Sequence, residues 1–272
     1  ESTVDDLARE RAPRRPATEA SAALSVTDVD ATDDRGEIRL RDVSLSVRPG
    51  EIVGIAGVAG NGQEELVECL VGLRPCARGR IELCGVDVTA LPVAPRRAAG
   101  LGFISADRAN QGLSPMASLS DNVIAGVHRG DVARRGWLRA SRVRALARRV
   151  LGGFSIRYGQ LADAARTLSG GNQQRLVIGR ELDREPRLLV AAEPTRGIDV
   201  KGSAVVHERL RALRDRGGAV LLVSEQLDEL LALADRIVVL HGGRISGEVR
   251  GGRDGRGAVG ELMLGRTPGG AA

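Results

Sequence analysis

Apolar and polar residues follow two different periods along this chain, and the change of period marks the expected elements. Between Ala23 and Ser46, short runs of alternating apolar residues surround a polar turn at 30–36, which is typical of antiparallel strands. Short continuous apolar runs then recur between turn residues, as expected for the buried strands of a sheet. These runs cover 52–56, 101–104, 187–192, 219–224 and 237–240.

Residues 116–165 lack strand alternation and carry helical runs instead. In Ser141–Phe154 the apolar side chains fall on one helical face, and the arginines lie elsewhere on the helix. We interpret these arginines as a solvated face, with contact to lipid headgroups as the alternative. Strands on both sides of a helical insertion predict an α/β fold with an antiparallel β part and an inserted helical subdomain.

A glycine-rich loop connects the expected strand at 52–56 to a helix that begins near Gln63. Phosphate-binding loops have this order of elements and the pattern G-x-x-x-x-G-K-[ST]. Gly57 and Gly62 have the required spacing, but Gln63 stands at the lysine position and Glu64 at the hydroxyl position. A carboxylate in the first helical turn already uses the positive end of the helix dipole. We therefore expect a degenerate loop, whose candidate residues are Gly57, Gly60, Asn61, Gly62, Gln63 and Glu64.

A second glycine-rich segment precedes the helical run at 176–182. Its serine can cap the helix, its glycine pair lets the backbone approach a ligand, and the helix N-terminus offers unpaired N–H groups. This combination suits a phosphate, and a glycine-rich helix cap without a ligand is the alternative. The candidate residues are Leu168, Ser169, Gly170, Gly171, Asn172 and Gln173.

A carboxylate follows each of two expected strands. Glu193 comes directly after the run at 187–192, and Glu225 comes directly after the run at 219–224. Ala192, directly before Glu193, has no side-chain ligand for a metal ion.

The composition excludes several classes of protein. The net charge of +5 comes almost entirely from arginine, and two Phe, one Trp and one Tyr leave few side chains to stack on bases, so we expect no nucleic-acid partner. Three cysteines without C-x-x-C spacing and three distant histidines predict neither a disulfide nor a metal site. No apolar run reaches the roughly 20 residues of a membrane span, and the first residues lack the charged-then-apolar pattern of a secretory signal.

The octet Leu168-Ser169-Gly170-Gly171-Asn172-Gln173-Gln174-Arg175, with the acidic turn Glu193-Pro194-Thr195 after it, resembles the signature of the ATP-binding cassette (ABC) family. Its Asn-Gln-Gln ending and the degenerate loop resemble the second cassette of bacterial nucleoside and simple-sugar importers. The resemblance covers 24–266. It implies an ABC-type P-loop nucleotide-binding domain, with a RecA-like core, an antiparallel β subdomain and a helical signature subdomain at about 115–175.

The resemblance also implies how the site residues divide. In the family, each ATP lies between the P-loop of one cassette and the signature of the other. Residues 168–173 are then expected to serve ATP and Mg²⁺ held mainly by a partner cassette. The resemblance makes Glu193 the general base of a degenerate site, because Ala192 stands where the family has a metal-binding aspartate. Asp199 corresponds to the D-loop, and Glu225 stands where the family has a histidine that contacts the γ-phosphate, which a carboxylate repels at neutral pH. The family's Q-loop corresponds to 105–113, where a salt-bridged turn formed by Asp107 and Arg108 is the structural alternative.

The segment at 1–11 echoes the one at 258–266, so residues 1–22 are interpreted as the tail of a preceding cassette with a linker, and 23–272 as one cassette. Expected partners are this N-terminal sibling on the same polypeptide, transmembrane permease subunits and an extracytoplasmic substrate-binding protein. The expected place is the cytoplasmic face of a bacterial cell membrane. The chain would supply the signature to a composite ATP site that powers uptake of nucleosides or simple sugars, and would be inactive alone. The alternative is a non-catalytic scaffold or regulatory module of the same fold.

Overall fold

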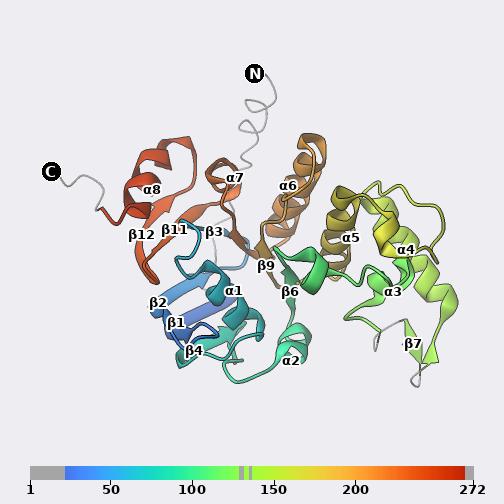
Figure 1. The fold of residues 1–272 in the computed structure, drawn as a ribbon, viewed down its shortest axis with the longest axis horizontal. Helices are drawn as coiled ribbons and strands as arrows, with labels where there is room; N and C mark the ends of the chain where they lie inside the picture. The colour runs from blue at the N-terminus through green and yellow to red at the C-terminus, as the bar shows by residue number, and fades with distance from the viewer. Residues whose placement is uncertain (1–21, 129–131, 135–136, 267–272) are drawn as a thin grey trace.

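The computed structural model describes residues 22–128, 132–134 and 137–266. The interpretation of residues 1–22 as a tail and linker therefore lies, except for residue 22, outside the described residues. Two sheets fill one part of the molecule, and helices α3, α4 and α5 stand to one side of them (Figure 1). The strands are β1 (Leu24–Thr32), β2 (Ile38–Val47), β3 (Ile52–Ala56), β4 (Arg78–Leu83), β5 (Val86–Asp87), β6 (Leu101–Ile104), β7 (Ala133–Arg134), β8 (Trp137–Leu138), β9 (Leu188–Ala192), β10 (Ala219–Val223), β11 (Arg236–His241) and β12 (Arg244–Arg250). The helices are α1 (Gln63–Val71), α2 (Val93–Ala98), α3 (Leu119–Ile124), α4 (Ala140–Gly153), α5 (Gly170–Asp183), α6 (Val200–Asp215), α7 (Leu227–Leu233) and α8 (Arg256–Met263).

The larger sheet has the strand order β12-β11-β3-β10-β9-β6. Its strands from β11 to β6 run parallel, and β12 pairs antiparallel with β11 at one edge. Every residue of β3, β9 and β10 is buried. Their side chains alternate between two hydrophobic clusters, so that Val53 and Ile55 belong to one cluster and Ile52 and Ala56 to the other. The prediction of continuous apolar strands buried on both faces is confirmed.

The smaller sheet is antiparallel and has the order β2-β1-β4-β5. Its inward side chains, such as Leu24 and Val29, share one hydrophobic cluster with Leu66 and Leu70 of α1 and with the larger sheet. Helix α1 is therefore held between the two sheets. The predicted antiparallel strands at the N-terminal side are confirmed.

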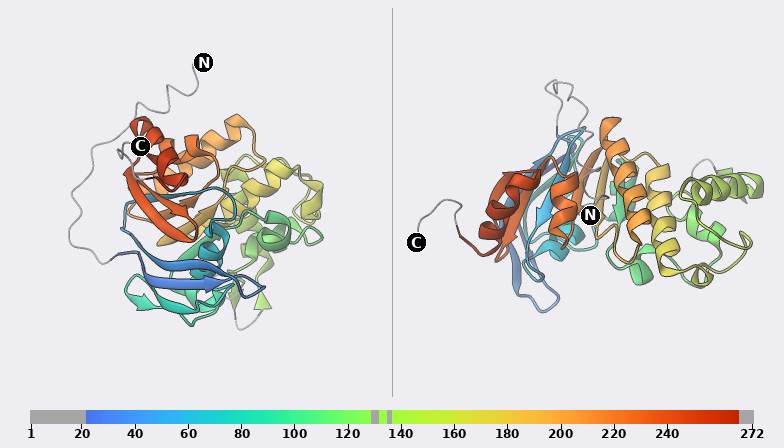
Figure 2. Two further views of the ribbon diagram at one scale, coloured as in Figure 1. Left: turned by 60° about the vertical axis from the view of Figure 1, so that its left-hand side comes forward. Right: turned by 90° about the horizontal axis from the view of Figure 1, so that it is seen from above.

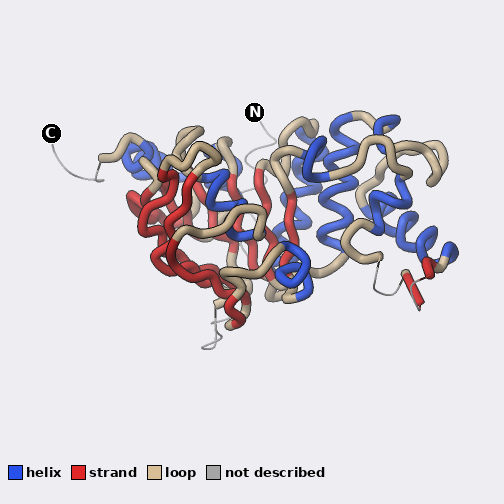
Figure 3. Tube along the Cα trace, turned by 60° about the horizontal axis from the view of Figure 1, so that its bottom comes forward, coloured by secondary structure: helices blue, strands red, loops and turns tan. Residues whose placement is uncertain are grey.

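The helical part extends away from the sheets, as the second view in Figure 2 and the colouring of Figure 3 show. Helix α4 occupies the predicted segment and buries Ala147, Val150 and Leu151, while Arg149 on its other side forms an ion pair with Asp183 of α5. Near α4 lies the short hairpin β7–β8, whose Trp137 is 81% exposed.

A fully buried carboxylate, Glu181 of α5, joins the helical part to the larger sheet. Its oxygens accept hydrogen bonds from Arg97 at 2.7 and 2.9 Å, from Arg180 at 3.1 Å and from the N–H of Phe103 at 3.3 Å. Arg180 also donates to the carbonyls of Gly112 and Asn122. Glu181 thus links α5 to α2 and β6, and Arg180 links α5 to α3 and to the turn after β6.

Candidate functional site

The carboxyl ends of the parallel strands meet at one edge of the larger sheet, and the loops that follow them build the site. The loop after β3, 57–62, is the segment predicted to be a degenerate P-loop. A β-carbon added to Gly57 would lie 2.4 Å from the Gln63 amide nitrogen and 2.7 Å from the Leu240 carbonyl oxygen, so this position requires glycine. Gly62 has φ of 104°, a left-handed conformation that glycine adopts without strain, and it precedes the first turn of α1.

Hydrogen bonds from the protein's own side chains and backbone occupy the polar groups of this loop. The Gln63 amide donates a hydrogen bond of 3.1 Å back to the carbonyl of Val58. The Asn61 amide donates to the same carbonyl at 3.0 Å, and its side-chain oxygen accepts the N–H of Gly242 at 2.8 Å. The N–H of Gly243 donates to the Asn61 carbonyl at 3.2 Å. The β11–β12 turn thus holds the loop in place through hydrogen bonds. The Gln63 amide stands at the position where the phosphate-binding pattern has a lysine, and it binds the loop's own backbone.

A cavity of about 520 Å³ opens beside the loop. The acidic residues that line it are Glu64, Glu68, Asp107, Glu193 and Glu225, and its described basic residue is Arg196. This excess of negative charge disfavours a nucleotide triphosphate. Ala106 and Ala192 also line the cavity but offer no side-chain ligand for a metal ion. The residues present therefore do not fit Mg²⁺-ATP, and no grouping of three or more metal-ligating side chains occurs in the part of the chain that the structure describes.

Glu193 stands at the end of β9 in a strained conformation, with φ of 47°. Its side-chain oxygen accepts the N–H of Glu225 at 2.6 Å. Burial raises the pKa of the Glu193 carboxyl above its ordinary value, the N–H of Glu225 opposes this shift, and the charges of Glu225 and Glu229 add to it. The carboxyl thus lies in the cavity at the predicted position, but it is bound to the neighbouring strand end and faces like charge.

The signature segment, Leu168–Gln173, lies at the start of α5. Ser169 is the exposed N-cap, and its oxygen accepts the N–H of Asn172 at 3.4 Å, which leaves its own hydrogen free to donate. Gln173 donates to the carbonyls of Ala165 and Leu168 and thereby fixes the turn before the helix. A serine hydroxyl beside the N-terminus of a long helix fits a phosphate group. The described residues that line the cavity include none of this segment, so the structure separates the two candidate sites.

The segment predicted to be the D-loop, Thr195–Asp199, runs beside the signature segment. A β-carbon on Gly171 would lie 3.3 Å from the carbonyl oxygen of Gly197, so the two segments are in contact. Asp199 caps α6 and accepts a hydrogen bond of 2.7 Å from Arg175 of α5. Sequence reasoning missed this pair, because only the fold brings the two residues together.

A buried group behind the D-loop was also missed. Glu229 of α7 accepts the hydroxyl of Thr195 at 2.9 Å and lies 2.8 Å from the ring nitrogen Nε2 of His207 in α6. Glu229 and Thr195 are both buried. No motif marked Glu229, and His207 had no neighbour in sequence that suggested a partner.

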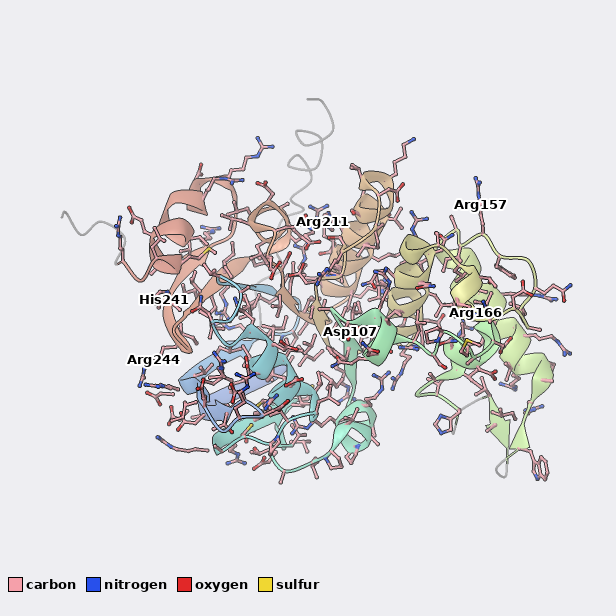
Figure 4. The ribbon with its side chains drawn as sticks, viewed as in Figure 1. Asp107, Arg157, Arg166, Arg211, His241 and Arg244 are labelled. Atoms are coloured by element: carbon pink, nitrogen blue, oxygen red, sulfur yellow. The ribbon has the colours of Figure 1, made fainter. Side chains whose placement is uncertain are left out.

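The salt-bridge alternative for Asp107 and Arg108 is wrong. The Asp107 carboxylate accepts the N–H of Asn110 at 3.1 Å and its side-chain amide at 2.7 Å, and these hydrogen bonds lower the pKa of Asp107. It thus caps the π-helical turn Arg108–Gly112. Figure 4 shows Asp107 at the centre of the molecule, between the sheet and α5.

Solved structures identify the class of this fold as an ATP-binding cassette. A dimeric cassette in a post-hydrolysis state, bound to ADP and phosphate, has a TM-score of 0.73 and 23% identity over 84% of this chain and 98% of that chain. A nucleotide-free ATP-binding cassette also has a TM-score of 0.73, at 22% identity over 88% of this chain and 96% of that chain. The predicted α/β cassette fold is confirmed.

The family model described as ABC transporter matches residues 40–196, and the chain belongs to this family. Guanosine import ATP-binding protein NupO of Bacillus subtilis is 40% identical over 93% of this chain and 50% of its own length. Nucleoside import ATP-binding protein NupA of Lactococcus lactis is 37% identical over 89% of this chain and 48% of its length. Ribose import ATP-binding protein RbsA 1 of Rubrobacter xylanophilus is 40% identical over 77% of this chain and 42% of its length. The chain spans about half the length of the curated relatives it matches.

Within the described residues, no helix has the length and apolar character needed to cross a membrane.

Proposed function

We propose that this chain is the C-terminal, catalytically degenerate cassette of a two-cassette ATP-binding protein that powers import of nucleosides or simple sugars. The observation that carries this proposal is the asymmetry between its two candidate sites. The acidic cavity beside the P-loop lacks the groups that hold Mg²⁺-ATP, whereas the exposed hydroxyl of Ser169 and the start of α5 suit a phosphate.

The lengths and names of the relatives support the proposal. NupO and NupA are about twice as long as the part that matches, which leaves room for a second cassette of similar size. Their names describe guanosine and nucleoside import, and RbsA 1 is named for ribose import. These names favour a nucleoside or a simple sugar as the cargo.

In the proposed assembly, the sibling's P-loop holds ATP and most of the coordination of Mg²⁺. The bound ion would neutralise charge on the phosphates. This chain contributes the Ser169 hydroxyl and the first N–H groups of α5 on the opposite side of the γ-phosphate, with the D-loop beside them. Further partners are transmembrane permease subunits and an extracytoplasmic substrate-binding protein, which place the cassette at the cytoplasmic face of the cell membrane.

A scaffold that touches no hydrolysed nucleotide is the rival function. It would need neither an exposed cap at the signature segment nor a D-loop packed against it, and both are present. The asymmetry therefore favours the composite site.

We expect the purified chain to bind Mg²⁺-ATP weakly and to hydrolyse it at the background rate. The Gln63 amide fills the loop, Ala192 offers no metal ligand, and Glu225 adds negative charge to the cavity. Titration with a fluorescent ATP analogue, with and without Mg²⁺, measures this affinity. Low-micromolar binding that depends on Mg²⁺ would contradict the proposed degeneracy.

Replacing Gln63 with Lys and Glu64 with Thr is expected to restore phosphate affinity without restoring turnover. A lysine adds one charge-assisted hydrogen bond, and such a bond tightens binding about tenfold to a hundredfold. Ala192 and Glu225 still leave the cavity without a metal ligand or a γ-phosphate contact. Glu65→Thr is the matched control, because Glu65 shares the helical turn but does not line the cavity. If the double variant hydrolysed ATP at a full rate, Ala192 and Glu225 would limit the activity less than proposed.

A further inference from the structure

Arg108 lies against both segments that the proposed function assigns to a partner's nucleotide. A β-carbon built on Gly170, the first residue of α5, would lie 2.8 Å from the Arg108 nitrogen Nη2. A β-carbon built on Gly197 of the D-loop would lie 3.2 Å from Nη1. The guanidinium therefore sits between the signature segment and the D-loop, and glycine at both positions gives it room.

The backbone holds Arg108 in this place. Asp107 accepts the N–H groups of Gln111 and Gly112 with its carbonyl oxygen, and the N–H of Leu113 donates to the Arg108 carbonyl. The hydroxyl of Ser105 donates to the side chain of Gln111 at 2.7 Å. Hydrogen bonds at its start and its end thus hold the turn that carries Arg108 in place without a ligand.

Asp107 precedes Arg108 in the chain, Asp199 follows Gly197 by two residues, and both carboxylates are already engaged. Asp107 binds Asn110, and Asp199 binds Arg175 at 2.7 Å. Among the described residues, no hydrogen bond or ion pair of the half-buried Arg108 side chain is seen. A guanidinium has five N–H donors, and partial removal from water disfavours it unless an anion binds. This environment suits an anionic ligand.

We infer that Arg108 is a further catalytic residue of the composite site and donates to the γ-phosphate of the nucleotide held by the sibling's P-loop. This inference rests on the proposed function. In hydrolysis a water oxygen bonds to the γ-phosphorus while the bond from that phosphorus to the β,γ-bridging oxygen breaks, giving ADP, phosphate and a proton. Negative charge shifts across the phosphoryl oxygens in this step, and a planar guanidinium beside Ser169 stabilises it through paired hydrogen bonds.

The test uses the complete importer, with both cassettes and the permease subunits. Arg108→Ala and Arg108→Gln are expected to lower kcat about tenfold to a hundredfold, the usual range for one charge-assisted contact to a transferring phosphoryl group. Both changes should weaken binding of a non-hydrolysable ATP analogue and leave ADP binding unchanged, because ADP lacks the γ-phosphate. Guanidinium ions added to Arg108→Ala should restore part of the rate.

Arg166→Ala is the matched control, because Arg166 is an exposed arginine shortly before the signature segment (Figure 4). It should leave the rate and both affinities unchanged. Equal losses of ADP and ATP-analogue affinity, or looser contact between the two linked cassettes without nucleotide, would assign Arg108 to a protein contact and overturn the inference. An unchanged rate in a folded Arg108→Gln importer would overturn it too. If Ser169→Arg abolishes hydrolysis in the same assay, the proposed function stands whatever the effect of the Arg108 variants. If neither Ser169→Arg nor Arg108→Gln changes the rate, the proposed function itself fails.

Discussion

Ser169→Arg is expected to slow ATP hydrolysis by the complete importer by about a hundredfold or more. A hydrogen bond to a charged phosphate contributes up to about 3 kcal/mol, and losing that much transition-state stabilisation corresponds to a rate loss of about a hundredfold. The arginine side chain would also occupy the exposed space above the start of α5, where the proposed γ-phosphate lies. The fold of this chain and the nucleotide affinity of its own cavity should not change, because Ser169 does not line the cavity.

Two further variants sharpen this experiment. Ser118 caps α3 as Ser169 caps α5, so Ser118→Ala shows what the loss of a helix cap alone does to the rate. Glu193→Gln should be mild, because Glu193 lies in the cavity proposed to be degenerate and its oxygen is already bound to the N–H of Glu225. The ATPase rates of the three variants decide the matter. A crippling Glu193→Gln together with a silent Ser169→Arg would reverse the proposed division between the two sites.

Glu181→Ala is expected to lower the free energy of unfolding by about 3–5 kcal/mol, the usual effect of removing one partner from a buried ion pair. Three arginines surround this carboxylate, which is fully buried, and its removal would leave Arg97 and Arg180 without a counter-charge. Denaturation in urea, followed by circular dichroism, measures the change.

Asp183→Ala provides the comparison for this experiment. Asp183 lies on the same helix, and its partner Arg149 is largely exposed, so the loss should be at most about 1 kcal/mol. Equal effects of the two substitutions would show that burial of Glu181 does not set the strength of its contacts.

The elements that local patterns define could be predicted from the sequence. Strands β3, β9 and β10 are continuous apolar runs because both of their faces are covered, and α4 keeps one apolar face. Helix α2 could not be predicted in the same way. It buries Arg96, which donates to the carbonyls of Cys69 and Leu70 at the end of α1, and in a chain with 40 Lys and Arg no sequence pattern marks one of them as buried.

The same distinction holds for the candidate site. The cap formed by Ser169 and the glycine turn at Gly62 are local, so residue type and spacing were sufficient to predict them. The pairing of Asp199 with Arg175 depends on how α5 and α6 pack, and only the fold shows it. Asp107 illustrates the opposite error, because its short side chain reaches the N–H of Asn110 and a salt bridge with its neighbour does not form.

The hairpin β7–β8 determines what the intrinsic tryptophan fluorescence of this chain reports. Trp137 is its single tryptophan, it is 81% exposed, and it lies on the helical part of the molecule, outside the set of residues that line the cavity. An indole in contact with water emits at long wavelength and is readily quenched by dissolved iodide or acrylamide. Intrinsic fluorescence of the chain therefore reports contacts of the β7–β8 hairpin, and an extrinsic dye is needed to follow events at the P-loop.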